Sequence, residues 1–211
     1  MTGTAPPSPA ADALPPDLVR RFAESLARLR PGSGPIGLAV SGGPDSMAML
    51  LLAHAAIPGE FEVATVDHGL RPEAADECAL VERACAERDI ACEILRVEVG
   101  EGNLQAKARE ARYQALDDWA VARLDAIATA HHADDQAETL LYRLSRGTGL
   151  KGLAGMAVAR RLGAGTLMRP MLSLSRQTFS VSVPEWRATL MARSTTRREP
   201  RSASTCTVPI R

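Results

Sequence analysis

The segment SGGPDS, residues 41–46, combines glycines, hydroxyls and a carboxylate directly after the apolar run IGLAV. Gly42 and Gly43 have no side chain, so successive backbone N–H groups can line a concavity, and a helix that starts there adds the positive end of its dipole. These features predict a phosphate-binding turn, although no Lys follows the glycines as in a Walker A loop. Asp45 is interpreted as a Mg²⁺ ligand, because Mg²⁺ takes carboxylate oxygens alongside phosphates. The alternative is a strand-to-helix turn with a capping side chain.

A second polar cluster, HHADDQAET, occupies residues 131–139. Asp134 and Asp135 open a predicted helix, where the dipole favours carboxylates, and this alone would account for them. With His131 they could also hold Mg²⁺, bind an ammonium group or orient a nucleophile. Two adjacent histidines are equally compatible with an ordinary loop, so the residues alone leave these alternatives open.

Basic residues form a third candidate group on the predicted helix NLQAKAREARYQAL. Arg109 and Arg112 are three positions apart and share a helix face, so they could hold an anionic ligand. The alternative is a solvated helix face. Two further segments, VDHGLR and the glycine-rich RGTGLKGLAGM, could meet a nucleotide or an RNA backbone, or could be a loop and a linker.

The elements that position these groups alternate along the chain. Apolar runs and helical spacing predict strands at 36–40, 61–66, 90–97 and 125–130, and helices at 17–30, 47–56, 73–88, 104–122 and 134–146. This order predicts an α/β fold with a doubly wound, mostly parallel, Rossmann-like sheet and helices on both faces. Since ligands bind beyond the carboxyl ends of such strands, the polar clusters are expected to converge on one crevice. The residues expected to face inward on the last two helices are Leu104, Ala108, Leu116, Trp119, Leu140, Leu141 and Leu144.

The composition is that of an ordinary soluble globular protein, with 45% apolar and 24% charged residues among 211. The formal net charge is zero, so there is no global basic signature for nucleic acid. No run of 18 apolar residues is present, which predicts no membrane-spanning helix and no membrane partner. Residues 1–16 lack the basic and apolar regions of a signal peptide and are expected to be a disordered Pro/Ala leader.

The four cysteines are Cys78, Cys85, Cys92 and Cys206, and none forms a CxxC pair. They are therefore expected to be buried or half-buried free thiols rather than metal ligands or disulfides, which fits a cytoplasmic protein.

Taken together and in this order, several strings resemble the tRNA(Ile)-lysidine synthetases, which are members of the PP-loop ATP pyrophosphatase group. The matching strings are LAVSGGPDSMAML, VDHGLR, NLQAKAREARYQAL, ATAHHADDQAETLLYRLSRGTGLKGLAGM and, more weakly, MRPMLSLSR. The resemblance covers residues 17–176. It implies a fold of the PP-loop adenine nucleotide α-hydrolase type and a PP-loop ATP-binding catalytic domain at 17–175.

The resemblance also implies a reaction. Enzymes of this family use ATP and Mg²⁺ to adenylate the wobble cytidine of the CAU anticodon of tRNA(Ile) at its O2 oxygen, with release of pyrophosphate. The amine of free L-lysine then displaces AMP and gives lysidine. A homodimer is one possible assembly. The alternatives are another PP-loop tRNA-modifying enzyme, or an ATP-binding protein without turnover.

The family pattern assigns roles to matching positions in this chain. It places Arg109 and Arg112 near the α-phosphate or the tRNA, and His131, Asp134 and Asp135 near the lysine substrate and the reacting phosphate. It places Asp45 near the metal. It also implies that ATP is bound by the turn comprising Ser41, Gly42, Gly43, Pro44, Asp45 and Ser46.

Residues 176–211 do not resemble the family. Arg, Ser, Thr and Pro make up 21 of these 36 residues, with seven Arg against two acidic residues. The segment is expected to be an irregular basic tail, the product of an aberrant or truncated C-terminus. The alternative is a basic RNA-binding tail.

Overall fold

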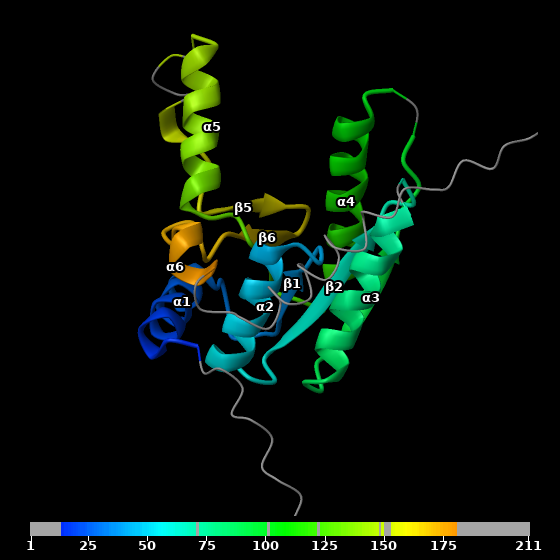
Figure 1. Cartoon of the computed structure of the whole chain (residues 1–211), viewed down its shortest axis with the longest axis vertical. Coiled ribbons are helices and arrows are strands. Elements are labelled where there is room, and N and C mark those ends of the chain that lie inside the picture. The colour runs from blue at the N-terminus through cyan, green and yellow to red at the C-terminus, as the bar shows by residue number, and fades with distance from the viewer. Residues whose placement is uncertain are drawn as a thin grey trace, which may run out of the picture.

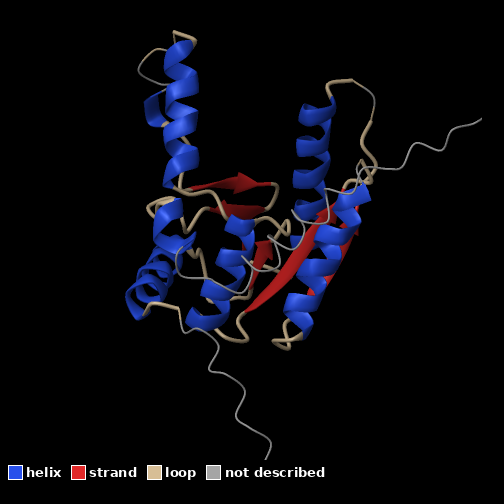
Figure 2. Ribbon diagram, viewed as in Figure 1, coloured by secondary structure: helices blue, strands red, loops and turns tan. Residues whose placement is uncertain are grey.

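The computed structural model describes residues 14–70, 72–100, 102–121, 123–147, 149 and 153–180. Helices and strands alternate through most of this part of the chain (Figure 1, Figure 2). The helices are α1 (Pro16–Leu29), α2 (Pro44–Ala56), α3 (Pro72–Ala86), α4 (Leu104–Ala120), α5 (Ala133–Ser145) and α6 (Arg176–Ser180). The strands are β1 (Ile36–Ala39), β2 (Phe61–Asp67), β3 (Cys92–Arg96), β4 (Ala126–Thr129), β5 (Ala159–Leu162) and β6 (Gly165–Met168).

These six strands lie in one sheet, in the order β3-β2-β1-β4-β6-β5. Neighbours pair in parallel from β3 to β6, and β5 pairs antiparallel with β6. This arrangement confirms the predicted α/β fold with a mostly parallel sheet. The β5–β6 hairpin is missing from the sequence-based prediction. Each of its strands has four residues, and the β5 segment ARRL shows neither an apolar run nor a clear alternation.

Helices cover both faces of the sheet, as predicted for a doubly wound fold. On one face α1, α2 and α3 share a core with strand residues such as Leu38 and Val63. On the other face, Leu116 and Trp119 of α4 form a second core. Gly37 alternates with Leu38 and faces α4, where a Cβ atom would lie 2.4 Å from the Trp119 ring. The glycine therefore lets α4 approach the sheet closely.

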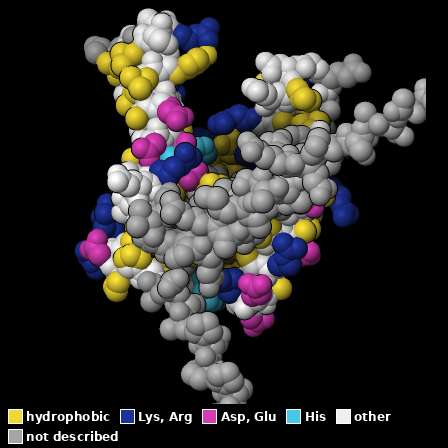
Figure 3. Space-filling model, viewed as in Figure 1, with side chains coloured by type: hydrophobic (Ala, Val, Ile, Leu, Met, Phe, Trp, Pro, Cys, Tyr) yellow, Lys and Arg dark blue, Asp and Glu magenta, His cyan; other side chains and the backbone are white. Residues whose placement is uncertain are grey.

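The first half of α4 and all of α5 project beyond the edge of the sheet (Figure 1). Leu104 is 52% exposed, and Leu141 and Leu144 are 67% and 52% exposed. Apolar side chains on α5 are visible at the surface of this projection in Figure 3. The predicted inward orientation is confirmed for Leu116 and Trp119 and is wrong for these three leucines. The helical spacing is present, but no strand lies beneath these turns to cover it.

The chain remains ordered across residue 176, where an irregular tail was expected to begin. Residues Arg176–Ser180 form α6, and Phe179 is fully buried in the main core. The prediction of irregular structure is therefore wrong for these five residues. Both the tail beyond residue 180 and the leader up to residue 13 lie outside the described residues.

The predicted burial of the cysteines is confirmed where the structure describes them. Cys78 and Cys85 are buried and Cys92 is half-buried, whereas Cys206 lies outside the described residues. Among the helices of the described part, none combines the length and the apolar character needed to cross a bilayer.

Candidate functional site

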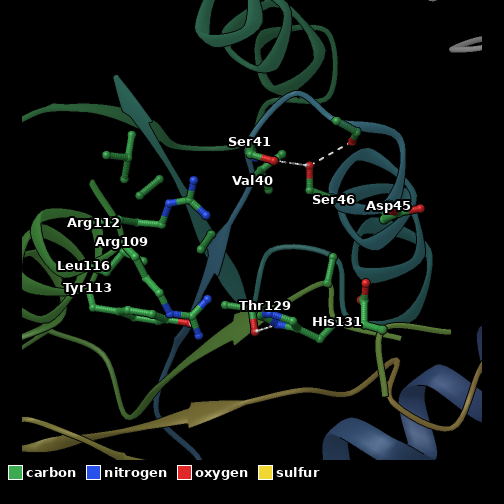
Figure 4. Close-up of a pocket in the computed structure, with 16 residues that line it drawn as sticks. Val40, Ser41, Asp45, Ser46, Arg109, Arg112, Tyr113, Leu116, Thr129 and His131 are labelled. Carbon is green, nitrogen blue, oxygen red and sulfur yellow. Dashed lines mark hydrogen bonds between the residues drawn. The ribbon is translucent and has the colours of Figure 1, made fainter. Parts of the chain in front are cut away.

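A pocket of about 260 Å³ opens at the carboxyl edge of the sheet, between the turn after β1, helix α4 and the turn after β4 (Figure 4). The structure thus brings together three segments that the sequence singled out. The predicted site residues that line the pocket are Ser41, Gly43, Asp45, Ser46, Arg109, Arg112, His131 and Asp135. Gly42, Pro44 and Asp134 are not among the lining residues.

The turn after β1 is held by its own serines. The Ser46 hydroxyl donates to the carbonyl of Gly43 at 2.9 Å, and its oxygen accepts from the backbone N–H of Ser41 at 3.1 Å. Gly42 has φ +73° and lies so close to α3 that a Cβ atom would be 2.9 Å from the carbonyl oxygen of Glu77. Any other residue would be strained there on both counts. The turn is therefore preformed, with α2 starting at Pro44 immediately behind it.

The start of α5 is capped by a buried histidine. His132, 1% exposed at its side chain, accepts the Asp135 backbone N–H at Nδ1, and the Asp135 carboxylate accepts the His132 backbone N–H at 2.9 Å. This reciprocal pair is a capping box. His132 also packs against Phe179 of α6, with 5.5 Å between the ring centroids and an angle of 57° between the ring planes. The place of the acidic pair at the start of a helix was one explanation for both aspartates, and it holds for Asp135. Asp135 caps the helix and also lines the pocket.

A charged network joins α2, α5 and α6 at this point. Arg176 donates from Nε and Nη2 to the two carboxylate oxygens of Asp45, at 3.1 and 2.8 Å. Its backbone N–H donates to Asp134 at 2.6 Å, and Nε2 of His132 lies 3.4 Å from Asp45. Figure 3 shows acidic, basic and histidine side chains gathered at the base of α5. Asp134 therefore anchors α6 instead of lining the pocket.

Across the pocket, α4 presents arginines and a tyrosine (Figure 4). The guanidinium of Arg109 lies 5.1 Å from the ring centroid of Tyr113, and its Nη2 donates to the tyrosine hydroxyl at 3.4 Å. Arg112 Nη2 lies 3.4 Å from Nε2 of His68, in the segment after β2. Burial, and then Arg109, lower the pKa of Arg112 from its ordinary value. A second positive charge nearby adds to the cost of burying this guanidinium.

His131 lies at the base of the pocket on the turn after β4. Its Nδ1 is 3.0 Å from the hydroxyl of Thr129, which donates to the carbonyl of Met168 at 3.4 Å. The network therefore assigns the proton to Nδ1 and leaves Nε2 as an acceptor. Burial, followed by the charge of Arg169, lowers the pKa of His131 to about 4. His131 is neutral at pH 7.

Two contributors to the site were not predicted from the sequence. His132 was noted next to His131 without a role, because histidine is not among the residues that usually cap a helix. Arg176 was assigned to the irregular tail. It is 131 positions from Asp45, so no local pattern could have linked the two.

The predicted Mg²⁺ position offers one carboxylate, that of Asp45, which lines the pocket. Among the described residues no group of three or more His, Cys, Asp or Glu side chains is arranged to hold a metal. Asp45 alone fits the manner in which Mg²⁺ binds beside a nucleotide, with one carboxylate and the remaining positions taken by phosphate oxygens and water.

The chain matches known proteins over most of its length. Residues 16–190 match the family model described as PP-loop domain. The chain is 53% identical over 163 residues to the tRNA(Ile)-lysidine synthase of Novosphingobium aromaticivorans, covering 74% of this chain and 49% of that protein. It is 52% identical over 147 residues to the tRNA(Ile)-lysidine synthase of Ruegeria pomeroyi, covering 67% of this chain and 35% of that protein. The chain thus spans about half the length, or less, of these relatives.

A solved structure supports the fold. The U34-tRNA thiolase NcsA from Methanococcus maripaludis, solved with its [4Fe-4S] cluster, superposes with a TM-score of 0.63 at 17% sequence identity. The match covers 90% of this chain and 68% of that one. At this identity the likeness concerns the fold alone.

Proposed function

The chain belongs to the PP-loop domain family, and on that premise we propose that it ligates L-lysine to the wobble cytidine of tRNA(Ile) with a CAU anticodon, at the expense of ATP. The observation that carries the proposal is one pocket that combines the phosphate-binding turn with arginines from α4 and with His131 and Asp135. The relatives named tRNA(Ile)-lysidine synthase, at 52–53% identity, support lysine and tRNA as the substrates.

The turn of residues 41–46 would hold the pyrophosphate part of ATP. Its glycine backbone and the start of α2 present N–H groups and a helix dipole to the same point. Asp45 would hold the Mg²⁺ ion, which neutralises phosphate charge when bound. Both oxygens of Asp45 accept from Arg176, so metal binding at Asp45 requires this ion pair to open.

Arg109 and Arg112 would face the α-phosphate, where negative charge develops during adenylation and later on the departing AMP. Neutral His131 suits this position, because an additional cation would be repelled by the arginines around it. Its free Nε2 can accept a hydrogen bond from an amino group. Asp135 and Asp134 lie on the side of the site where an ammonium group would be favoured.

The test is release of AMP from ATP by the full chain, with lysine and a CAU-anticodon tRNA each added or omitted. We expect pyrophosphate release and an adenylated tRNA when tRNA is added without lysine. We expect AMP, and a tRNA whose mass has increased by one lysine less one water, only when tRNA and lysine are both present. ATP binding without AMP release would instead indicate a nucleotide-binding protein without turnover. AMP release that needs RNA but leaves lysine unincorporated would indicate another tRNA-modifying PP-loop enzyme.

Two further expectations, on the cellular location and on the oligomeric state, belong with this proposal. A cytoplasmic location would place the enzyme with its tRNA, ATP and lysine. A homodimer stays a prediction, to be measured by light scattering of the purified chain.

A further inference from the structure

Two arginines of the β5–β6 hairpin reach the same tyrosine as Arg109. The guanidinium of Arg160 lies 4.8 Å from the ring centroid of Tyr113, and the guanidinium of Arg169 lies close enough to Tyr113 to interact with it electrostatically. We name this group, Arg109, Tyr113, Arg160 and Arg169, the arginine–tyrosine cluster. Arg160 belongs to none of the motifs found in the sequence, and Arg169 belongs only to the weakly matching string MRPMLSLSR, which was given no site role.

The strand register explains why the hairpin arginines meet α4. Arg160 on β5 pairs with Leu167 on β6, and Leu167 belongs to the core beneath α4. Side chains alternate along a strand, so Arg169 follows on the same face as Leu167. Arg161, next to Arg160, is directed to the opposite face by the same alternation. The sheet thus directs Arg160 and Arg169 to Tyr113.

The arginines of the cluster are positively charged, and no carboxylate among the described residues forms an ion pair with them. Among the described ion pairs, none joins Arg109, Arg112, Arg160 or Arg169 to a carboxylate. Arg169 is only 4% exposed, donates to the carbonyl of Ala157, and has an Nε with no hydrogen-bond partner. A buried guanidinium without a counter-ion is costly, and the charge of Arg160 adds to that cost. An anionic ligand would offset it.

The position of the cluster separates it from the phosphate-binding turn. The turn follows β1, whereas Arg169 follows β6 and Arg160 lies on β5, with β4 between them in the sheet. With strands about 4.8 Å apart, β1 and β6 are separated by roughly 10 Å. Of the cluster, Arg109 and Tyr113 line the pocket together with the turn, whereas Arg160 and Arg169 lie beside it. Arg160 and Arg169 therefore stand apart from the turn and are available for an anionic group of a second substrate.

We propose that Arg160 and Arg169 of the arginine–tyrosine cluster bind a phosphodiester of the RNA substrate, next to the nucleotide whose base enters the pocket, while Arg109 stays with the α-phosphate. The inference rests on the proposed function and specifies how the RNA is held. Arg169 is buried and Arg160 is exposed, so the positive charge extends from the surface toward Tyr113, which lines the pocket. Guanidinium groups suit phosphate because of their planar, bidentate geometry.

The test uses the full chain and a CAU anticodon stem-loop RNA, titrated by fluorescence anisotropy over a range of NaCl concentrations. The variant is Arg160→Gln, and the matched control is Arg161→Gln, which removes the same charge from the opposite face of the same strand. We expect Arg160→Gln to weaken RNA binding about tenfold near 0.1 M salt and to reduce the slope of log K against log salt by about one. Arg161→Gln should change binding less than twofold, and ATP binding should be equal in all three proteins.

The outcomes separate this inference from the proposed function. Equal RNA affinity and salt slope in the two variants, with tRNA-dependent AMP release in the parent chain, would overturn the inference alone. RNA binding that depends on Arg160 in a chain that releases no AMP would support the RNA site and overturn the ligase. Weaker ATP binding in Arg160→Gln, a raised KM for lysine with unchanged RNA binding, or no RNA binding by the parent chain would each overturn the inference.

Discussion

The two sides of the pocket treat charge in opposite ways. On the α5 side, Asp45, Asp134 and Asp135 each accept from a neighbouring side chain or backbone group, and Arg176 supplies a cation. On the α4 side, the arginine–tyrosine cluster has no carboxylate partner within the described residues. The charged groups of the first side are paired within the folded chain, whereas the second side keeps an excess of positive charge.

The comparison distinguishes charged groups that stabilise the fold from charged groups that are available to a ligand. A carboxylate that caps a helix or anchors another segment contributes to folding with no ligand bound. Buried cations without counter-ions cost stability, and such a cost is expected where a site awaits an anion. The pKa of His131, which lies between the two sides, is lowered first by burial and then by the charge of Arg169, which is such a cation.

The largest expected effect comes from removing the carboxylate that both Arg176 and the proposed metal share. Asp45→Asn should reduce tRNA-dependent AMP release by about 10²–10³-fold, since an amide is a poor Mg²⁺ ligand and transition-state charge would be left uncompensated. The measurement is AMP formation at saturating ATP, with Asp17→Asn on α1 as a control far from the pocket. Unchanged AMP release in Asp45→Asn would remove this residue from the mechanism.

Phe179→Ala tests whether α6 is an integral part of the α5 side. The side chain is fully buried and contacts His132, so its truncation should lower the free energy of unfolding by about 3 kcal/mol. Urea denaturation of the full chain measures this change. A loss below about 0.5 kcal/mol, the range of ordinary surface substitutions, would mean that α6 contributes nothing to the core.

The pKa of His131 provides a pH test of the positively charged side. Its pKa falls from 6.5 to about 4 on folding, so the folded chain binds fewer protons than the unfolded chain between these values. The contribution of His131 to the free energy of unfolding should therefore be fully present above pH 6.5. It should be lost as the pH falls toward 4, by about 2 kcal/mol after allowance for partial solvent exposure. His131→Asn should lack this component in urea denaturation at pH 4.5 and 7. A His131 ring titration near 6.5 by NMR would contradict the burial and charge argument.

The smallest effect is expected from the ion pair on the other side. Arg176 is 55% exposed at its side chain, so its pairing with Asp45 is screened by solvent. Arg176→Gln should change the free energy of unfolding by less than about 1 kcal/mol. Urea denaturation beside Phe179→Ala provides the comparison. A loss as large as that of Phe179→Ala would show that the charged contact, and not the apolar one, holds α6 in place.

Parts of the fold were predictable because the signals are local. The strands before each polar cluster are short apolar runs. The helix expected from residue 104 begins at Leu104, where Asn103 is the N-cap and accepts the Ala106 N–H. The exposed Leu141 and Leu144 were misjudged because helical spacing marks an apolar face but not what covers it. The β5–β6 hairpin has too few residues for a periodic signal.

The sequence by itself determined the alternation of strands and helices, the glycine turn at residues 41–46 and the residue types that follow each strand, because these depend on local backbone chemistry. Only the tertiary structure decided that Arg176 pairs with Asp45 and that Arg160 and Arg169 meet Tyr113. Those contacts join residues tens of positions apart. The pairing of β5 with β6 places Arg160 beside α4, and the packing of α6 places Arg176 beside Asp45, so no local pattern links the partners.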